Sequence, residues 1–129
     1  MAVVVAEHLA GSESAFARAM TEKAQAMGMS RTTFRNASGL PHSGQKTTAR
    51  DMATLGQAIM RDFPEKYEYF KTRSFAFHGR YYRNHNRQLG RVKGVAGIKT
   101  GHIRPSGFKL VARPRRGPPP LVHLVLVAP

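Results

Sequence analysis

The sequence contains no cysteine among its 129 residues. This absence excludes disulfide bonds and thiolate metal sites, although it leaves the redox compartment open. Long apolar runs are also missing, since no stretch reaches the roughly 18 residues that a membrane-spanning helix needs. The apolar start, Met1–Ala10, is interrupted by Glu7 and His8 and has neither the basic beginning nor the cleavage site of a signal peptide. We therefore expect no transmembrane segment and see no export signal.

Acidic residues are few, and they are confined to the first part of the chain. All seven lie between Glu7 and Glu68, whereas thirteen of the twenty-one lysines and arginines lie from Lys71 onward. The net charge of +14 therefore divides into +1 before Lys71 and +13 after it. Such asymmetry predicts attraction to a polyanion: nucleic acid, anionic lipid or an anionic cell-wall polymer. A basic surface that only keeps the protein in solution is the alternative.

The first part of the chain has the apolar spacing of helices. Gly11 ends the first helix, Thr48 caps the third with Asp51 as the expected box partner, and Pro64 ends the third. We expect helices over Met1–Ala10, Ser12–Met27 and Thr48–Phe63, and one short helical turn over Glu65–Phe70. The side chains expected in the core are Phe16, Ala19, Met20, Ala24, Met27, Met52, Leu55, Ile59, Phe63, Tyr67 and Phe70.

From Lys71 onward the apolar period shifts toward two, which predicts strands. His78-Gly79 has the turn chemistry of a hairpin between Ser74–Phe77 and Arg80–Arg83. Further strands are expected over Gly94–Thr100, Gly107–Arg113 and Leu121–Ala128, with the proline-rich Arg115–Pro120 linking the last two. With 41% hydrophobic and 22% charged residues, the chain has the composition of a globular protein. The predicted fold class is α+β: a single domain over residues 1–129, with helices packed on one antiparallel sheet.

The stretch Val95–Gly101 has the residue types of a carboxylate-binding site. Val95 and Ile98 suit a strand, and Lys99 lies at its end, followed by the hydroxyl of Thr100 and by Gly101. A substrate carboxylate needs a positive charge, a hydroxyl donor and a backbone without an obstructing side chain. A solvated lysine at the end of a strand is the alternative, because a tripeptide recurs by chance.

Several stretches, in order and with near-family spacing, resemble the D-alanyl-D-alanine carboxypeptidases. These are low-molecular-mass penicillin-binding proteins of serine peptidase family S11, and the resemblance is to the C-terminal part of their catalytic domain. The resembling stretches are Ala6–Phe16, Phe34–Pro41, Gly44-Gln45 with Thr47–Ala53, Asp62–Pro64 with Tyr69-Phe70, Tyr82–Arg87, and Gly97–Gly101 with Ser106–Phe108. The resemblance implies a penicillin-binding-protein/β-lactamase-like (transpeptidase) fold. Residues 113–129 match poorly and form a divergent C-terminal segment.

The resemblance also implies a reaction. In this family a serine attacks the peptide carbonyl between the two terminal D-alanines of a peptidoglycan stem peptide, and water then releases the acyl-enzyme. β-Lactams acylate the same serine. Lys99 and Thr100 would hold the terminal carboxylate of the substrate, with Gly101 beside them. The family needs no metal or cofactor and acts outside the cytoplasmic membrane.

The chain departs from the family pattern in several ways. The family's Ser-x-x-Lys and Ser-x-Asn motifs lie before the region that matches Ala2, so we expect a truncated piece of the enzyme. Ala96 stands where the family has aspartate, and His102-Ile103 where it has an aromatic or polar pair. The chain is then either a serine-type hydrolase of stem peptides or β-lactams, or a catalytically dead remnant that binds them. Self-association that covers exposed apolar faces is a further expectation.

Three other patterns in the sequence have residue types that could carry chemistry. Ser43 and Lys46 have the spacing of a serine nucleophile and its base, although Pro41 and Gly44 favour a loop, whereas the family's nucleophile opens a helix. His78, His85 and His102 lack a nearby carboxylate and the close spacing of a zinc site, so no metal is expected. The stretch Arg80–Lys93 mixes bases with aromatics, as nucleic-acid surfaces do, and a hairpin with packed tyrosines is the alternative.

Overall fold

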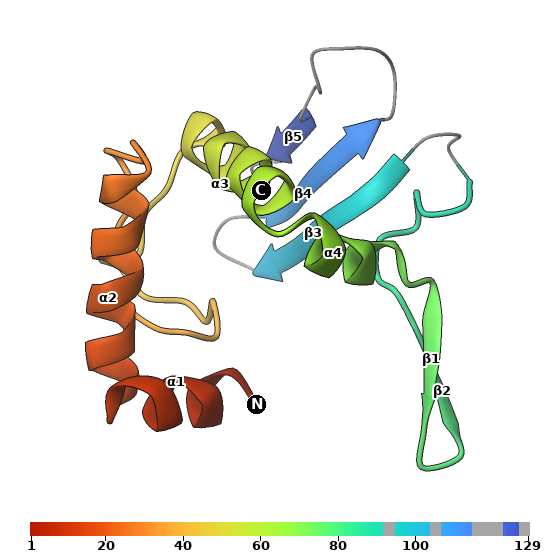
Figure 1. Cartoon of the computed structure of the whole chain (residues 1–129), viewed down its shortest axis with the longest axis horizontal. Helices are drawn as coiled ribbons and strands as arrows, with labels where there is room; N and C mark the ends of the chain where they lie inside the picture. The colour runs from red at the N-terminus through yellow and green to blue at the C-terminus, as the bar shows by residue number, and fades with distance from the viewer. Residues whose placement is uncertain (92–94, 104–106, 115–122, 127–129) are drawn as a thin grey trace. The chain divides into compact units, whose positions relative to one another are not determined.

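Two units make up the chain, Met1–Leu55 and Gly56–Pro129. The computed structural model describes residues 1–91, 95–103, 107–114 and 123–126 (Figure 1). The predicted Arg115–Pro120 link and both ends of the predicted strand Leu121–Ala128 lie outside these residues. The expectation that the chain forms a single domain stays a prediction.

The first unit begins with α1 (Ala2–Ala10) and α2 (Glu13–Ala26), as predicted. Gly11 has a φ of 74° and donates its N–H to the carbonyl of Glu7 at 2.8 Å, which closes α1 in the left-handed conformation that glycine tolerates. The hydroxyl of Ser12 accepts from the N–H of Ala15 at 3.2 Å and caps α2. Local chemistry therefore sets both helix ends.

The buried stripe of α2 differs from the expected one. Ala17 and Ala24 are buried, whereas Ala19 is exposed, so the prediction for Ala19 was wrong. Positions 17 and 24 lie two helical turns apart on one face, and Ala19 points to another side of the helix. Phe16 and Met20 are half-buried beside this stripe.

Asp51 joins the third helix to the preceding loop. This helix, α3 (Ala49–Asp62), begins in the first unit and ends in the second, and the hydroxyl of Thr48 caps it by accepting from the N–H of Asp51 at 3.2 Å. The Asp51 carboxylate was expected to complete a capping box, but it accepts instead from the Thr32 hydroxyl at 2.6 Å and the Arg31 N–H at 3.0 Å. The Thr32 hydrogen bond, helped by that of Arg31, lowers the pKa of Asp51 against the opposing effect of burial.

The core of the second unit lies between helix and sheet. Pro64 is the first residue of α4 (Pro64–Tyr67), which leads into the 3₁₀-helix η1 (Glu68–Lys71). Tyr67 and Ile98 are buried, and Ile59, Met60, Phe70 and Val111 pack against them. Phe63 was expected in this core, but it is 59% exposed, because it caps α4 with a non-helical backbone and so leaves the stripe of α3.

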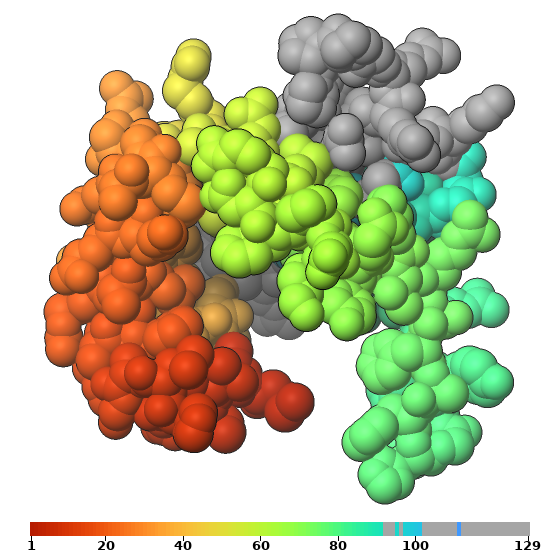
Figure 2. All heavy atoms as spheres, viewed as in Figure 1, coloured from red at the N-terminus to blue at the C-terminus, as the bar shows by residue number. Residues whose placement is uncertain are grey.

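The strands form two antiparallel sheets. The hairpin of β1 (Ser74–Phe77) and β2 (Arg80–Arg83) turns at His78-Gly79, and both turn residues have positive φ, as a tight hairpin turn needs. Figure 2 shows this hairpin standing clear of α4. The second sheet has the order β3-β4-β5, from β3 (Val95–Ile103), β4 (Gly107–Pro114) and β5 (His123–Leu126).

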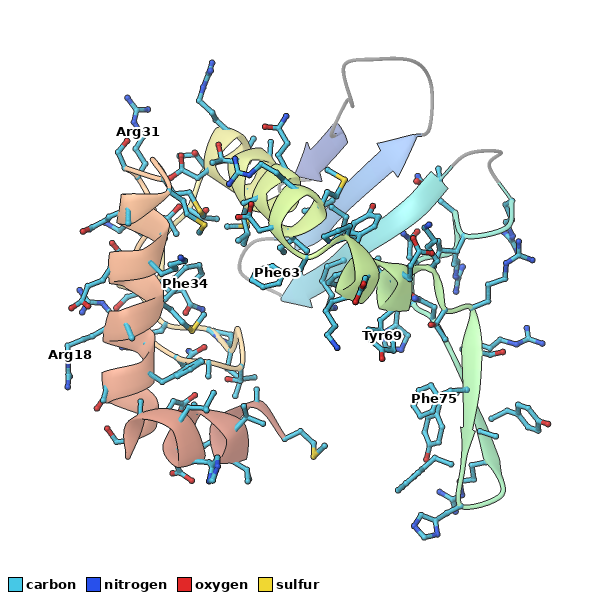
Figure 3. All side chains as sticks on the ribbon, in the orientation of Figure 1. Arg18, Arg31, Phe34, Phe63, Tyr69 and Phe75 are labelled. Carbon is cyan, nitrogen blue, oxygen red and sulfur yellow. The ribbon has the colours of Figure 1, made fainter. Side chains whose placement is uncertain are left out.

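The α+β prediction is confirmed, with the hairpin as a small sheet of its own. The alternative that tyrosines pack on one face of the hairpin was wrong, because Tyr81 is 83% and Tyr82 43% exposed. Phe75, labelled in Figure 3, stacks on Tyr82 with ring centroids 5.2 Å apart. Within the part of the chain that the structure describes, no helix is long and apolar enough to cross a membrane.

Candidate functional site

The Lys-Thr-Gly stretch lies within β3, where burial alternates along the strand. Ile98 is 8% and Thr100 9% exposed, whereas Lys99 and Gly101 are exposed. This alternation follows from the strand period of two, which sends successive side chains to opposite faces. The Lys99 ammonium donates to the carbonyl of Thr100. Among the described carboxylates, none lies within ion-pair distance of Lys99.

β3 is an edge strand in the described sheet, because it pairs with β4 alone. An edge strand presents unpaired backbone N–H and C=O groups that can pair with an extended peptide. The exposed ammonium of Lys99 therefore lies on a strand that can take up a peptide backbone.

Gly97 brings β3 close to η1. A Cβ at this position would lie 3.0 Å from the Phe70 Cβ and 3.6 Å from the Tyr67 Oη, and the φ of Gly97 is 121°. Both the contact and the backbone conformation require glycine here. A small residue was expected at Gly101, and the structure adds Gly97 as the point of close approach.

A loop held by asparagine side chains leads from the hairpin to β3. The Asn84 Oδ1 accepts from the Asn86 N–H at 2.9 Å, and the Asn86 Oδ1 accepts from the Gln88 N–H at 3.1 Å. Asn86 is 4% exposed, and its Nδ2 donates to the Gly97 carbonyl at 3.3 Å, which ties the loop to β3. In the sequence this Asn-x-Asn pair stood out only as part of the family resemblance, with no role of its own.

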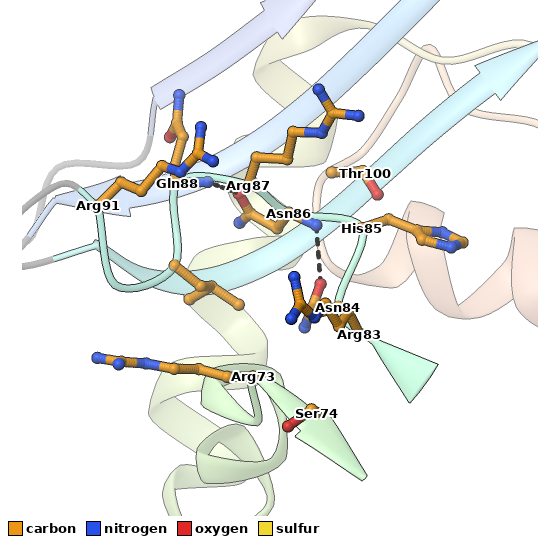
Figure 4. A pocket seen from close by; sticks show the side chains of 11 residues that line it. Arg73, Ser74, Arg83, Asn84, His85, Asn86, Arg87, Gln88, Arg91 and Thr100 are labelled. Carbon is orange, nitrogen blue, oxygen red and sulfur yellow. Dashed lines mark hydrogen bonds between the residues drawn. The ribbon is translucent and has the colours of Figure 1, made fainter. Parts of the chain in front are cut away.

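A groove of about 1040 Å³ opens between this loop, the base of the hairpin and β3 (Figure 4). It is lined by Arg73, Ser74, Arg83, Asn84, His85, Asn86, Arg87, Gln88, Leu89, Arg91 and Thr100. The Arg73 guanidinium reaches across Gly90, whose hypothetical Cβ would lie 2.8 Å from the Arg73 Cζ. Thr100 therefore belongs both to the Lys-Thr-Gly stretch and to a strongly basic groove.

The other predicted site residues lie elsewhere. Ser43 is in an exposed turn of the first unit, and Lys46 forms a β-bridge with Thr33. The two do not share a helical face, and the described hydrogen bonds include none between them. The loop that Pro41 and Gly44 predict is therefore present here.

The histidines are dispersed in the described structure. His78 lies in the hairpin turn with its ring against that of Phe77, and His85 lines the groove. The side chain of His102 is outside the described part of the structure. Nowhere in the described ranges do three histidine, aspartate or glutamate side chains gather as a metal site.

Comparison with known proteins identifies the family. The family model of the D-alanyl-D-alanine carboxypeptidases matches residues 1–129. The chain belongs to this family. It is 39% identical over 125 residues to D-alanyl-D-alanine carboxypeptidase DacA of Escherichia coli K12, a match that covers 96% of this chain and 31% of the relative. A carboxypeptidase of the same family, DacF of Bacillus subtilis, is 31% identical over 89% of this chain and 31% of its own length.

Solved structures of penicillin-binding proteins have the same fold. Penicillin binding protein 5 from Haemophilus influenzae superposes with a TM-score of 0.90 and 34% identity, over 98% of this chain and 38% of that chain. Penicillin-Binding Protein D2 from Listeria monocytogenes, solved in the ampicillin-bound form, gives a TM-score of 0.86 with 29% identity, over 98% and 53%. The predicted family and transpeptidase fold are therefore confirmed. The chain spans about a third of the length of the curated carboxypeptidases it matches.

Proposed function

We propose that this chain forms the carboxylate-binding wall of a serine-type D-Ala-D-Ala carboxypeptidase site that takes peptidoglycan stem peptides and β-lactams. The family supports this proposal, and a relative with the same fold was solved with ampicillin bound. In such a site Lys99 holds the terminal carboxylate on the exposed face of β3, with the unobstructed backbone at Gly101 on that same face, whereas the hydroxyl of Thr100 lies on the buried face of the strand.

The observation that carries the proposal is the environment of Lys99. Its ammonium is exposed on an edge strand and has no carboxylate within ion-pair distance among the described residues. A substrate carboxylate would supply this missing partner through a charge-assisted hydrogen bond. The free edge of β3 would pair with the peptide backbone and thus fix the carbonyl that is attacked.

The residues of this chain contribute binding and orientation to the reaction. The acyl-enzyme forms when a serine hydroxyl attacks the carbonyl between the two D-alanines, loses its proton to a base and expels the terminal D-alanine; water then hydrolyses the ester. We propose that Ser43 takes no part in this step, because Ser43 lies in a turn and Lys46 in a β-bridge rather than together on a helix.

Titration with a peptide that ends in D-Ala-D-Ala, followed by NMR, tests the role of Lys99. We expect Lys99→Ala to weaken binding about fivefold, roughly 1 kcal/mol for an exposed ion pair. Lys99→Arg should retain part of the affinity. The matched control is Lys66→Ala, which removes an exposed lysine from α4 of the same unit. Equal dissociation constants for the Lys99→Ala variant and the wild type would contradict the proposal.

Labelling with a fluorescent penicillin separates a hydrolase from a remnant that only binds. A covalent adduct on this chain, mapped by mass spectrometry, would locate a nucleophile within residues 1–129. Saturable binding of the same penicillin without an adduct would support the catalytically dead alternative for this chain.

A further inference from the structure

The basic groove next to Thr100 is unusual in its charge. Arg73 and Arg83 line it at the base of the hairpin, and Arg87 and Arg91 line it from the Asn84–Arg91 loop (Figure 4). None of the described residues that line the groove is acidic, and the sequence has no acidic residue from Lys71 to the end. Clustered cations of one sign repel each other, and an anion bound between them relieves that repulsion.

The loop cations are held on an ordered scaffold. The N–H of Arg91 donates to the Gln88 carbonyl at 3.1 Å, and the Gln88 N–H donates to the Asn86 side chain. Asn86 is itself buried and bonded to β3. Because the backbone that carries the arginines is fixed before a ligand arrives, less conformational entropy is lost on binding.

The groove favours separate carboxylates over a nucleic acid. Nucleic acids that bind as single strands stack their bases on aromatic side chains along a basic track. The described lining of this groove contains no phenylalanine or tyrosine, and the exposed rings of Phe75 and Tyr82 stack on each other. By strand alternation those two rings lie on the hairpin face opposite Arg83. Arginine, in contrast, binds carboxylates through two parallel hydrogen bonds.

We infer that this groove recognises additional carboxylates of an acidic stem peptide, upstream of the terminal D-Ala-D-Ala. This inference rests on the proposed function, because Thr100 lines the groove and its neighbour in β3, Lys99, belongs to the proposed carboxylate site. The arginines would then act as specificity determinants that select acidic peptides over peptides whose side carboxyls are amidated.

A matched pair of peptides tests this inference on the chain itself. Both peptides end in free D-Ala-D-Ala; one has two upstream carboxylates, and in the other these are carboxamides. From exposed ion pairs of 0.2–1 kcal/mol each, we expect the acidic peptide to bind roughly 2- to 30-fold more tightly. The preference should shrink at about 1 M salt, where the screening length falls to about 3 Å.

Arginine variants test whether the preference for the acidic peptide over the amidated peptide comes from the groove. Arg73→Gln combined with Arg87→Gln should remove most of the preference, because it weakens binding of the acidic peptide far more than binding of the amidated one. Arg87→Lys should keep part of it. Arg80→Gln is the control, because it removes one exposed arginine of the same hairpin that does not line the groove.

Each outcome bears on the inference. If both peptides bind equally and Lys99→Ala weakens both, the inference fails and the proposed function stands. If neither peptide binds, both fail. If a short single-stranded oligonucleotide binds more tightly than the acidic peptide and loses affinity in the Arg73/Arg87 variant, the groove is a nucleic-acid site and the inference is overturned.

Discussion

Replacing Asn86 with alanine should destabilise the second unit, because this buried side chain joins the loop to β3. The change removes one hydrogen bond from the Gln88 N–H and one to the Gly97 carbonyl. At about 0.5–1.5 kcal/mol for each net hydrogen bond, the expected loss of unfolding free energy is roughly 1–3 kcal/mol. Gly97 is buried, so water cannot readily replace the lost donor at its carbonyl.

Urea unfolding followed by circular dichroism measures this loss, and amide exchange at Gln88 localises it. The matched control is Asn84→Ala. Asn84 is exposed, and its side chain donates to the Thr72 carbonyl at 3.0 Å and accepts from Asn86, contacts that water can replace. The reasoning is refuted if Asn86→Ala costs no more than Asn84→Ala, or if Gln88 exchanges at the wild-type rate.

Three further changes have defined outcomes. Since hydrogen bonding from Thr32 lowers the pKa of Asp51 below its ordinary value of 3.8, ionised Asp51 stabilises the fold above that value, and this stabilisation is lost as the pH falls through the lower folded-state pKa. Melting of Asp51→Asn should therefore depend less on pH than melting of the wild type between about pH 5 and pH 2. Gly97→Ala should cost about 1–3 kcal/mol in urea unfolding, because its methyl group would press on Phe70 at a positive φ. Ser43→Ala should leave labelling by a fluorescent penicillin unchanged, since Ser43 lies in an exposed turn.

Each of these three predictions has a matched control variant or an outcome that would contradict it. Glu22→Gln removes an exposed carboxylate of α2 that has no ion pair within the described residues, and it should leave the acid dependence as in the wild type. Gly79→Ala changes another glycine with positive φ but with no atom near its added methyl group, so it should cost less than Gly97→Ala. A fall in penicillin labelling for the Ser43 variant would restore Ser43 as a nucleophile.

The helix ends and the hairpin could be predicted because their signals are local. Gly11, Ser12, Thr48 and Pro64 each act on residues within four positions, through a cap or a break. The turn at His78-Gly79 also depends only on its own backbone preferences. Such features follow from the sequence without knowledge of the tertiary structure.

Features that depend on distant partners were missed or misplaced. Spacing suggested Ala19 as a core residue, but the partners of α2 lie on the side of Ala17 and Ala24. The Asp51 carboxylate bonds to Thr32, nineteen residues earlier, rather than to its own helix end.

The candidate site also has one part that could be predicted from the sequence and one part that could not. The Lys-Thr-Gly stretch is contiguous and was recognised from its residue types. The groove could not be foreseen, since Arg73 and Arg91 line it together only because the loop folds back and Gly90 leaves room for the Arg73 guanidinium.

The irregular pairing of β3 with β4 has a consequence for how such a site can evolve. Between Val95 and Ile98 the register shifts, and beyond it Lys99 pairs with Val111 and Thr100 with Leu110. A shift of Ile98–Ile103 by one residue against β4 would turn the ammonium inward and the hydroxyl outward, with no change in the Lys-Thr-Gly letters themselves. Two homologues with the same tripeptide could thus present different side chains to a substrate. A comparison of such homologues must therefore include the face of the strand on which each residue lies, as well as the motif itself.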